Sequence, residues 1–157
     1  VTRYSGRVSL IVFSILFILL PVHEQRLSAF LSSKYFLVFA LTHGIHLVQL
    51  LVFVYLSGNE LIPIRLAGGF LAYAFIFAMP VIHHGNKTGK VSDQKFRWAQ
   101  SVYLYYVWFI FFMSYLPRVQ GKLTHIGGSY WEFVVLLCWV CMLLGMKLPA
   151  LVFQRRK

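Results

Sequence analysis

Acidic side chains are scarce in this sequence of 157 residues, which has 4 aspartates and glutamates against 15 lysines and arginines. The four acids lie near the ends of apolar stretches, so no pair of buried carboxylates is available for general acid–base catalysis. The sequence also lacks a glycine-rich phosphate loop before a helix and any arrangement of serine, histidine and acid. A non-enzymatic role is therefore the favoured interpretation, and enzymatic activity stays an open question.

Charged residues of both signs make up only 12% of the chain, whereas 59% of it is hydrophobic. A soluble domain is about a quarter charged, and a chain of this length has too little interior to hide so many apolar side chains. The bilayer must act as solvent, and in lipid such apolar runs satisfy their backbone groups as helices. The sequence therefore predicts an all-α fold, an integral membrane bundle of helices.

About five stretches are apolar and long enough to be transmembrane helices. We predict a single transmembrane domain over residues 1–157, with spans at about 8–22, 35–56, 62–83, 99–116 and 130–146 and a basic interfacial tail at 147–157. Pro21 and Pro117 are expected to end the first and fourth helices, because proline removes a backbone donor. The first stretch is short, so a half-inserted segment is the alternative.

Basic residues are distributed unequally between the two sides of these spans. Ten of them fall on one side: Arg26, Lys34, Lys87, Lys90, Lys95, Arg97, Lys147, Arg155, Arg156 and Lys157. Five fall on the other: Arg3, Arg7, Arg65, Arg118 and Lys122. The positive-inside rule makes the first side cytoplasmic, with the N-terminus out and the C-terminus in, in a bacterial inner membrane. No basic run could track a nucleic acid, so the expected partners are the lipid bilayer and other membrane subunits.

His43 and His46 are the residues best placed for chemistry, because both lie well inside the second predicted span. Their three-residue spacing puts them on one helix face, and ionisable groups at this depth are often functional. Neutral imidazoles could bind heme iron. The alternative is a structural role in hydrogen bonds between helices, with Gln49 or Thr42 as partners. Gly44 between them would let a flat ligand or another helix approach.

Three further features have a structural and a functional interpretation. His83 and His84 lie at the end of the third span and are expected to be a solvated boundary, with metal or proton handling as the alternative. Cys138 and Cys141 form a CxxC pattern inside an apolar helix, where packing is favoured over redox chemistry. The aromatic fourth helix would contact lipid and neighbouring helices, or else a quinone or pigment.

Three short motifs also carry a family resemblance. They are ALTHGIHL at 40–47, GGFLAY at 68–73 and FRWAQSVYL at 96–104. Together, from about Lys34 to Arg118, they resemble the ferric reductase-like transmembrane family, which includes small bacterial heme-binding membrane subunits. The resemblance implies a helical membrane protein in which the first motif lies on the heme-ligand helix.

The sequence departs from that family where its second set of histidines should stand. No histidine lies between His84 and His125, so a bis-histidine heme of the family's type cannot be assembled from this chain alone. The leading prediction is therefore an accessory or structural subunit of a larger membrane complex, of a redox or photosynthetic kind. The alternative is a b-type heme electron carrier using His43 and His46. No metal site is predicted, and the cofactor is unknown, with heme b, a pigment or a quinone as candidates.

Overall fold

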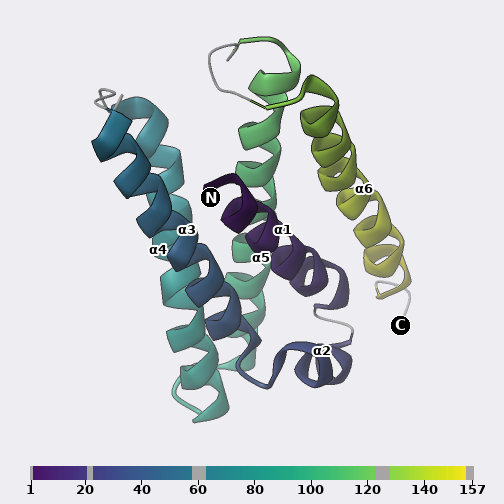
Figure 1. The fold of residues 1–157 in the computed structure, drawn as a ribbon. Helices are drawn as coiled ribbons and strands as arrows, with labels where there is room; N and C mark the ends of the chain where they lie inside the picture. Colours follow the sequence, from purple (N-terminus) through teal and green to yellow (C-terminus); the bar gives the residue numbers. More distant parts are fainter. Residues whose placement is uncertain (1, 21–22, 58–62, 123–127, 155–157) are drawn as a thin grey trace. The chain divides into compact units, whose positions relative to one another are not determined.

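The computed structural model describes residues 2–20, 23–57, 63–122 and 128–154, and these residues form helices and short turns without any strand. The order is α1 (Thr2–Leu19), α2 (Glu24–Leu31), α3 (Tyr35–Ser57), α4 (Pro63–Lys87), α5 (Asp93–Val119) and α6 (Tyr130–Gln154) (Figure 1). The predicted all-α class is confirmed.

Four helices of the described chain are long and apolar enough to cross a membrane. The stretches concerned are Tyr35–Leu56, Gly68–Lys87, Asp93–Val119 and Tyr130–Lys147. At most 28% of any of these stretches is buried inside the protein, so most of their apolar side chains need lipid or a partner around them. The predicted membrane helices are confirmed in these four places, whereas the first apolar helix, Tyr4–Leu19, is shorter.

Several predicted boundaries differ from the observed ones. The first helix begins at Thr2 and ends at Leu19 instead of spanning 8–22, and α2 was not predicted at all. The prediction that Pro117 ends the fourth helix is wrong, because α5 continues to Val119. Pro117 lacks the donor to the preceding turn, but the chain stays helical after it, and the N–H of Gln120 donates to the carbonyl oxygen of Leu116 at 3.0 Å. Pro21 lies outside the described residues.

The C-terminal segment was predicted as a separate interfacial piece beginning at residue 147. The helix α6 continues through this boundary, from Tyr130 to Gln154, while its apolar stretch of membrane-spanning length ends at Lys147, so the interfacial position of residues 147–157 stays a prediction. Leucine, methionine and lysine are good helix formers, and nothing in the local sequence before Lys147 ends the helix. Residues 155–157 lie outside the described part of the chain.

Contacts divide the chain into two compact units, residues 1–104 and 105–157, with the division inside α5. In the first unit α3 packs against both α1 and α4, and α2 lies against α1 and α3. Aromatic rings fill its core: Phe13 is 5.6 Å from Phe39, and Phe36 is 5.4 Å from Tyr103, measured between ring centroids.

The second unit joins α6 to the C-terminal part of α5. The indole Nε1 of Trp108 donates a hydrogen bond of 2.8 Å to the carbonyl oxygen of Val140. Nearer the connection between the two helices, the guanidinium of Arg118 lies over the ring of Phe133, with 5.4 Å from Cζ to the ring centroid. The contacts in this unit therefore join large side chains of one helix to the other helix.

Candidate functional site

His43 and His46 point from α3 toward α1, where each meets a serine. The Oγ atom of Ser9 is hydrogen-bonded to Nδ1 of His43, and the Oγ atom of Ser5 lies 3.0 Å from Nδ1 of His46. The two serines are four residues apart on α1 and the two histidines three apart on α3, so antiparallel helices bring both pairs into register. We call these four residues the serine–histidine seam.

Small residues on α1 let the two helices approach closely along this seam. A Cβ atom added at Gly6 would lie 3.2 Å from Cε1 of His46, which is tighter than an ordinary van der Waals contact. Ser5 and Ser9 have the spacing of small residues that is typical of close helix pairs in membranes. Ser5, Gly6 and Ser9 were not predicted as site residues, and their small-residue spacing is the signal in the sequence that identifies such a helix contact.

The imidazole of His43 is enclosed by aromatic rings. It stacks on Phe39 with centroids 5.3 Å apart, and the ring of Tyr73 from α4 lies 4.9 Å away. Only 9% of His43 is exposed. A hydrogen bond to Nδ1 suits a histidine that binds a metal through its other nitrogen, since ligating histidines are commonly held in this way.

The hydrogen-bond partners predicted for this pair were wrong, although a bond between helices was expected. The hydroxyl of Thr42 donates to the carbonyl oxygen of Phe39 in its own helix, at 2.9 Å. The side-chain oxygen of Gln49 is buried without a hydrogen-bond partner among the described residues. The element that approaches Gly44 is the helix α4, because a Cβ atom added at Gly44 would lie 3.5 Å from the ring of Phe77.

His83 belongs to a second cluster, at the N-terminal end of α3. The phenol of Tyr35 donates a hydrogen bond of 2.6 Å to Oε1 of Glu24 and lies 3.4 Å from Nε2 of His83. That nitrogen is 3.9 Å from the same carboxylate oxygen. We call Glu24, Tyr35 and His83 the boundary cluster, since it joins α2 to the start of α3 and the end of α4.

The prediction of a solvated histidine pair is correct for His84 and wrong for His83. His84 is exposed, whereas His83 is only 6% exposed. The ring of His83 stacks on Phe96 with centroids 5.6 Å apart and meets the ring of Phe36 at 5.2 Å. Adjacent residues of a helix point about 100° apart, so one of them faces the core while the other faces outward.

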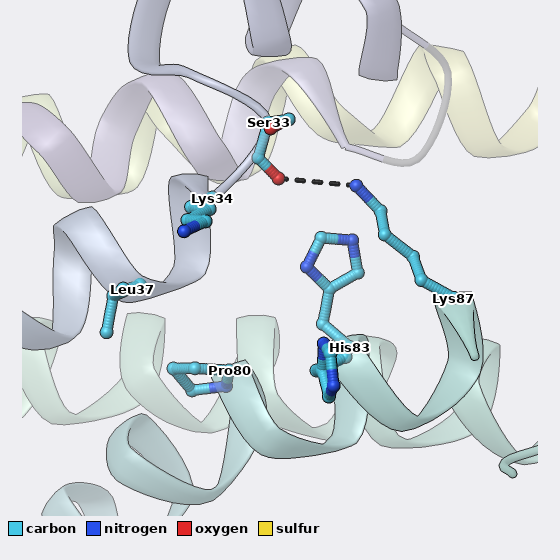
Figure 2. A pocket seen from close by; sticks show the side chains of 7 residues that line it. Ser33, Lys34, Leu37, Pro80, His83 and Lys87 are labelled. Atoms are coloured by element: carbon cyan, nitrogen blue, oxygen red, sulfur yellow. Dashed lines mark hydrogen bonds between the residues drawn. The ribbon is translucent and has the colours of Figure 1, made fainter.

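A surface pocket of about 330 Å³ lies beside the boundary cluster, between the start of α3 and the end of α4. Figure 2 shows Ser33, Lys34 and Leu37 on one side of the pocket and Pro80, His83 and Lys87 on the other. His84 also lines the pocket. The Nζ atom of Lys87 reaches across to the carbonyl oxygen of Ser33 at 3.4 Å. The pocket therefore combines cationic side chains with two apolar ones.

The remaining predicted features are placed as follows. Cys138 and Cys141 are both exposed on α6, so the prediction that they serve as packing residues is wrong.

On α5 the side chains of Tyr103, Val107, Phe111 and Tyr115 are buried, whereas Phe109 is exposed. Their four-residue spacing gives the aromatic helix one buried stripe. Within it, the hydroxyl of Tyr103 has no hydrogen-bond partner in the described part of the chain.

Within the described residues, no group of three or more histidine, cysteine or acidic side chains could hold a metal ion. The two histidine clusters are separated along α3, since Tyr35 and His43 are eight residues, or about 12 Å, apart. No family model, curated protein or solved structure matches this chain. The side-chain geometry is therefore the basis for the functional proposal.

Proposed function

We propose that this chain is a structural subunit of a larger membrane protein complex, of a redox or photosynthetic kind, without a catalytic site of its own. The observation that carries the proposal is the serine–histidine seam. His43 and His46, the side chains best suited to chemistry inside the spans, are bonded to serines of a neighbouring helix. Hydrogen bonds of this kind hold helices together in lipid, where no water competes for them.

The outer surface of the helices supports assembly with other chains. On α3 the exposed side chains Leu41, Ile45, Val48 and Val52 repeat at helical spacing, and each is at least half exposed. In a membrane such a stripe contacts either lipid or the helices of a partner. A structural subunit would use some of this surface for assembly.

The proposal is tested by extracting the tagged chain from its native membrane in lipid discs, without detergent. We expect particles that contain further membrane proteins in fixed ratio, identified by mass spectrometry and by cross-linking to this chain. Recovery of the chain as a lone monomer would contradict the proposal. Membranes in which the chain carries a scrambled tag sequence, handled in parallel, show which proteins bind the resin by themselves.

A b-type heme electron carrier is the second candidate, because the Nδ1 hydrogen bonds of His43 and His46 resemble those of ligating histidines. It requires a further ligand from outside the chain. The test is an absorption spectrum of the same particles, oxidised and then reduced with dithionite. A b-type difference spectrum lost in both His43→Ala and His46→Ala, and kept in the matched control His84→Ala, would favour this candidate over the first.

For the topology we propose five crossings, with α1 as the first, in the inner membrane of a bacterium. Lys34 and Lys87 line one pocket, so the loops before α3 and after α4 lie at the same end of the first unit. That end carries the larger set of basic residues and would be cytoplasmic. Reporter fusions after Lys90 and after Gly121 test this orientation, and a cytoplasmic signal from the second fusion alone would contradict it.

A further inference from the structure

The pocket between α3 and α4 is basic at one end and apolar at the other, which matches the headgroup and the acyl chains of an anionic phospholipid. On α4 one stripe runs Lys87, His84, Pro80 and Phe77, at spacings of three and four residues that place them on one helix face. The matching stripe begins at Lys34, just before α3, and continues with Leu37 and Leu41 on that helix. Both stripes begin with a cation at the end of the span and become apolar toward its middle.

The basic side chains at the rim of the pocket are accessible and have no carboxylate partner in the part of the chain that the structure describes. Lys34, His84 and Lys87 are exposed, and neither lysine forms an ion pair within the described residues. The closest acid of the cluster, Glu24, is engaged instead by the phenol of Tyr35 and lies 3.9 Å from His83. The positive charge at the rim is therefore available to an anion from outside the chain.

Apolar surface continues from the floor of the pocket along the two helices. Leu37 and Pro80 line the pocket, and Phe77 one turn deeper is close to Gly44 of α3. Leu41 is 60% exposed and Phe77 is 47% exposed, so both offer surface to a hydrocarbon chain. An inorganic anion would use only the rim, whereas a lipid would use the rim and this surface together.

We propose that this pocket binds an anionic phospholipid, with Lys34, His84 and Lys87 around its phosphate and Leu37, Leu41 and Phe77 along one acyl chain. The volume of about 330 Å³ is ample for a phosphodiester headgroup. Basic pockets between membrane helices on the cytoplasmic side recognise anionic headgroups in this way. The proposal does not depend on the structural role of the chain, because it concerns a separate set of residues.

The test uses the full chain in lipid discs, with native mass spectrometry to count retained lipids. The probe is phosphatidylglycerol diluted into phosphatidylcholine. We expect one retained phosphatidylglycerol, and a drop in its apparent affinity of about 25-fold in the double variant Lys34→Gln with Lys87→Gln, since each basic residue next to an anionic headgroup contributes about fivefold. The matched control, Lys90→Gln with Lys95→Gln, removes the same charge outside the pocket and should change the affinity less than twofold.

Equal loss in the two double variants would overturn the proposal, because it would mean that binding follows net charge alone. A second arm adds inorganic phosphate to the chain in neutral detergent and follows its melting temperature. Stabilisation by millimolar phosphate equal to that by phosphatidylglycerol would also overturn it, in favour of a soluble anion. Leu41→Ser, at an exposed position that should not affect folding, must weaken phosphatidylglycerol retention while leaving any phosphate effect unchanged.

Discussion

The two compact units of this protein are held together by different chemistry. In the first unit, polar side chains from different helices meet, as in the serine–histidine seam and the boundary cluster. In the second unit, the contacts between α5 and α6 come from large aromatic and cationic side chains, such as Trp108 and Arg118. A histidine in a membrane span can thus serve as the bonding group of a helix pair, and its presence alone does not identify a cofactor site.

The largest effect should come from enlarging Gly6 at the seam. Leucine at this position would drive its side chain into the ring of His46, which already lies 3.2 Å from an added Cβ atom. We expect Gly6→Leu to lower the free energy of unfolding by about 2–3 kcal/mol, as overpacking does. The measurement is a titration of the protein from mild detergent into dodecyl sulfate, followed by circular dichroism.

Gly145→Leu in the second unit is the matched control for this change. No atom outside its own helix lies within 4 Å of a Cβ added at Gly145, so the leucine would extend into open surroundings. Its unfolding free energy should stay within about 0.5 kcal/mol of the parent protein. Equal losses at Gly6 and Gly145 would contradict the close packing at the seam.

Removal of one seam hydroxyl should have the next largest effect. Ser9→Ala leaves the buried imidazole of His43 without its partner, which should cost about 1–1.5 kcal/mol. Ser14→Ala is the control on the same helix, because Ser14 is equally buried and bonds to the carbonyl oxygen of Leu10 in its own helix. We expect the control to lose less than half as much, and the opposite order would disprove the seam as a link between helices.

Two buried tyrosines allow a sharper comparison inside the first unit. Tyr35→Phe removes the hydrogen bond to Glu24 and should cost about 1 kcal/mol, because the partly exposed carboxylate can take up water instead. Tyr103→Phe removes a hydroxyl that has no partner among the described residues, so stability should be unchanged or slightly higher. A larger loss in Tyr103→Phe than in Tyr35→Phe would show that Tyr103 has a bound water or ligand.

The smallest effect is expected in the second unit. Trp108→Phe keeps an aromatic ring but removes the bond from Nε1 to the carbonyl oxygen of Val140, at a cost of about 0.5–1 kcal/mol. The control is Trp98→Phe, also on α5, where the side chain is 71% exposed. The titration into dodecyl sulfate described above compares the two variants, and an equal loss of unfolding free energy in both would contradict the role of the Trp108 bond.

Much of the fold could be predicted from composition, because a helix in lipid requires only a long apolar run and its own backbone bonds. The four long helices were identified on this basis. The ends were harder to place: α4 extends past His83 to Lys87, where Gly89 with φ of 73° follows, and α5 begins at Asp93 before its apolar run. Polar residues at a membrane surface can be helical or not, and hydropathy does not distinguish the two cases.

His43 and His46 were selected from the sequence as a polar pair inside a span, and both lie on α3 within its apolar stretch, while their role as a cofactor site stays a prediction. Their partners were not selected, because Ser9 is 34 residues from His43 and Ser5 is 41 residues from His46 along the chain. The choice of Gln49 and Thr42 relied on nearness in sequence. A polar side chain in a helix can bond to the backbone of its own helix, as Thr42 does, or point away from its sequence neighbours.

The sequence by itself determined that this protein is helical and resides in a membrane, because apolar length and the scarcity of charge leave no other solvent for it. Only the tertiary structure decided what the polar residues do. Contact between α1 and α3 gave the two histidines serine partners, and contact among α2, α3 and α4 buried His83 while leaving Lys34 and Lys87 around a pocket. The physical reason is that hydropathy belongs to single residues and short runs, whereas hydrogen-bond partners depend on which helices meet and in what register.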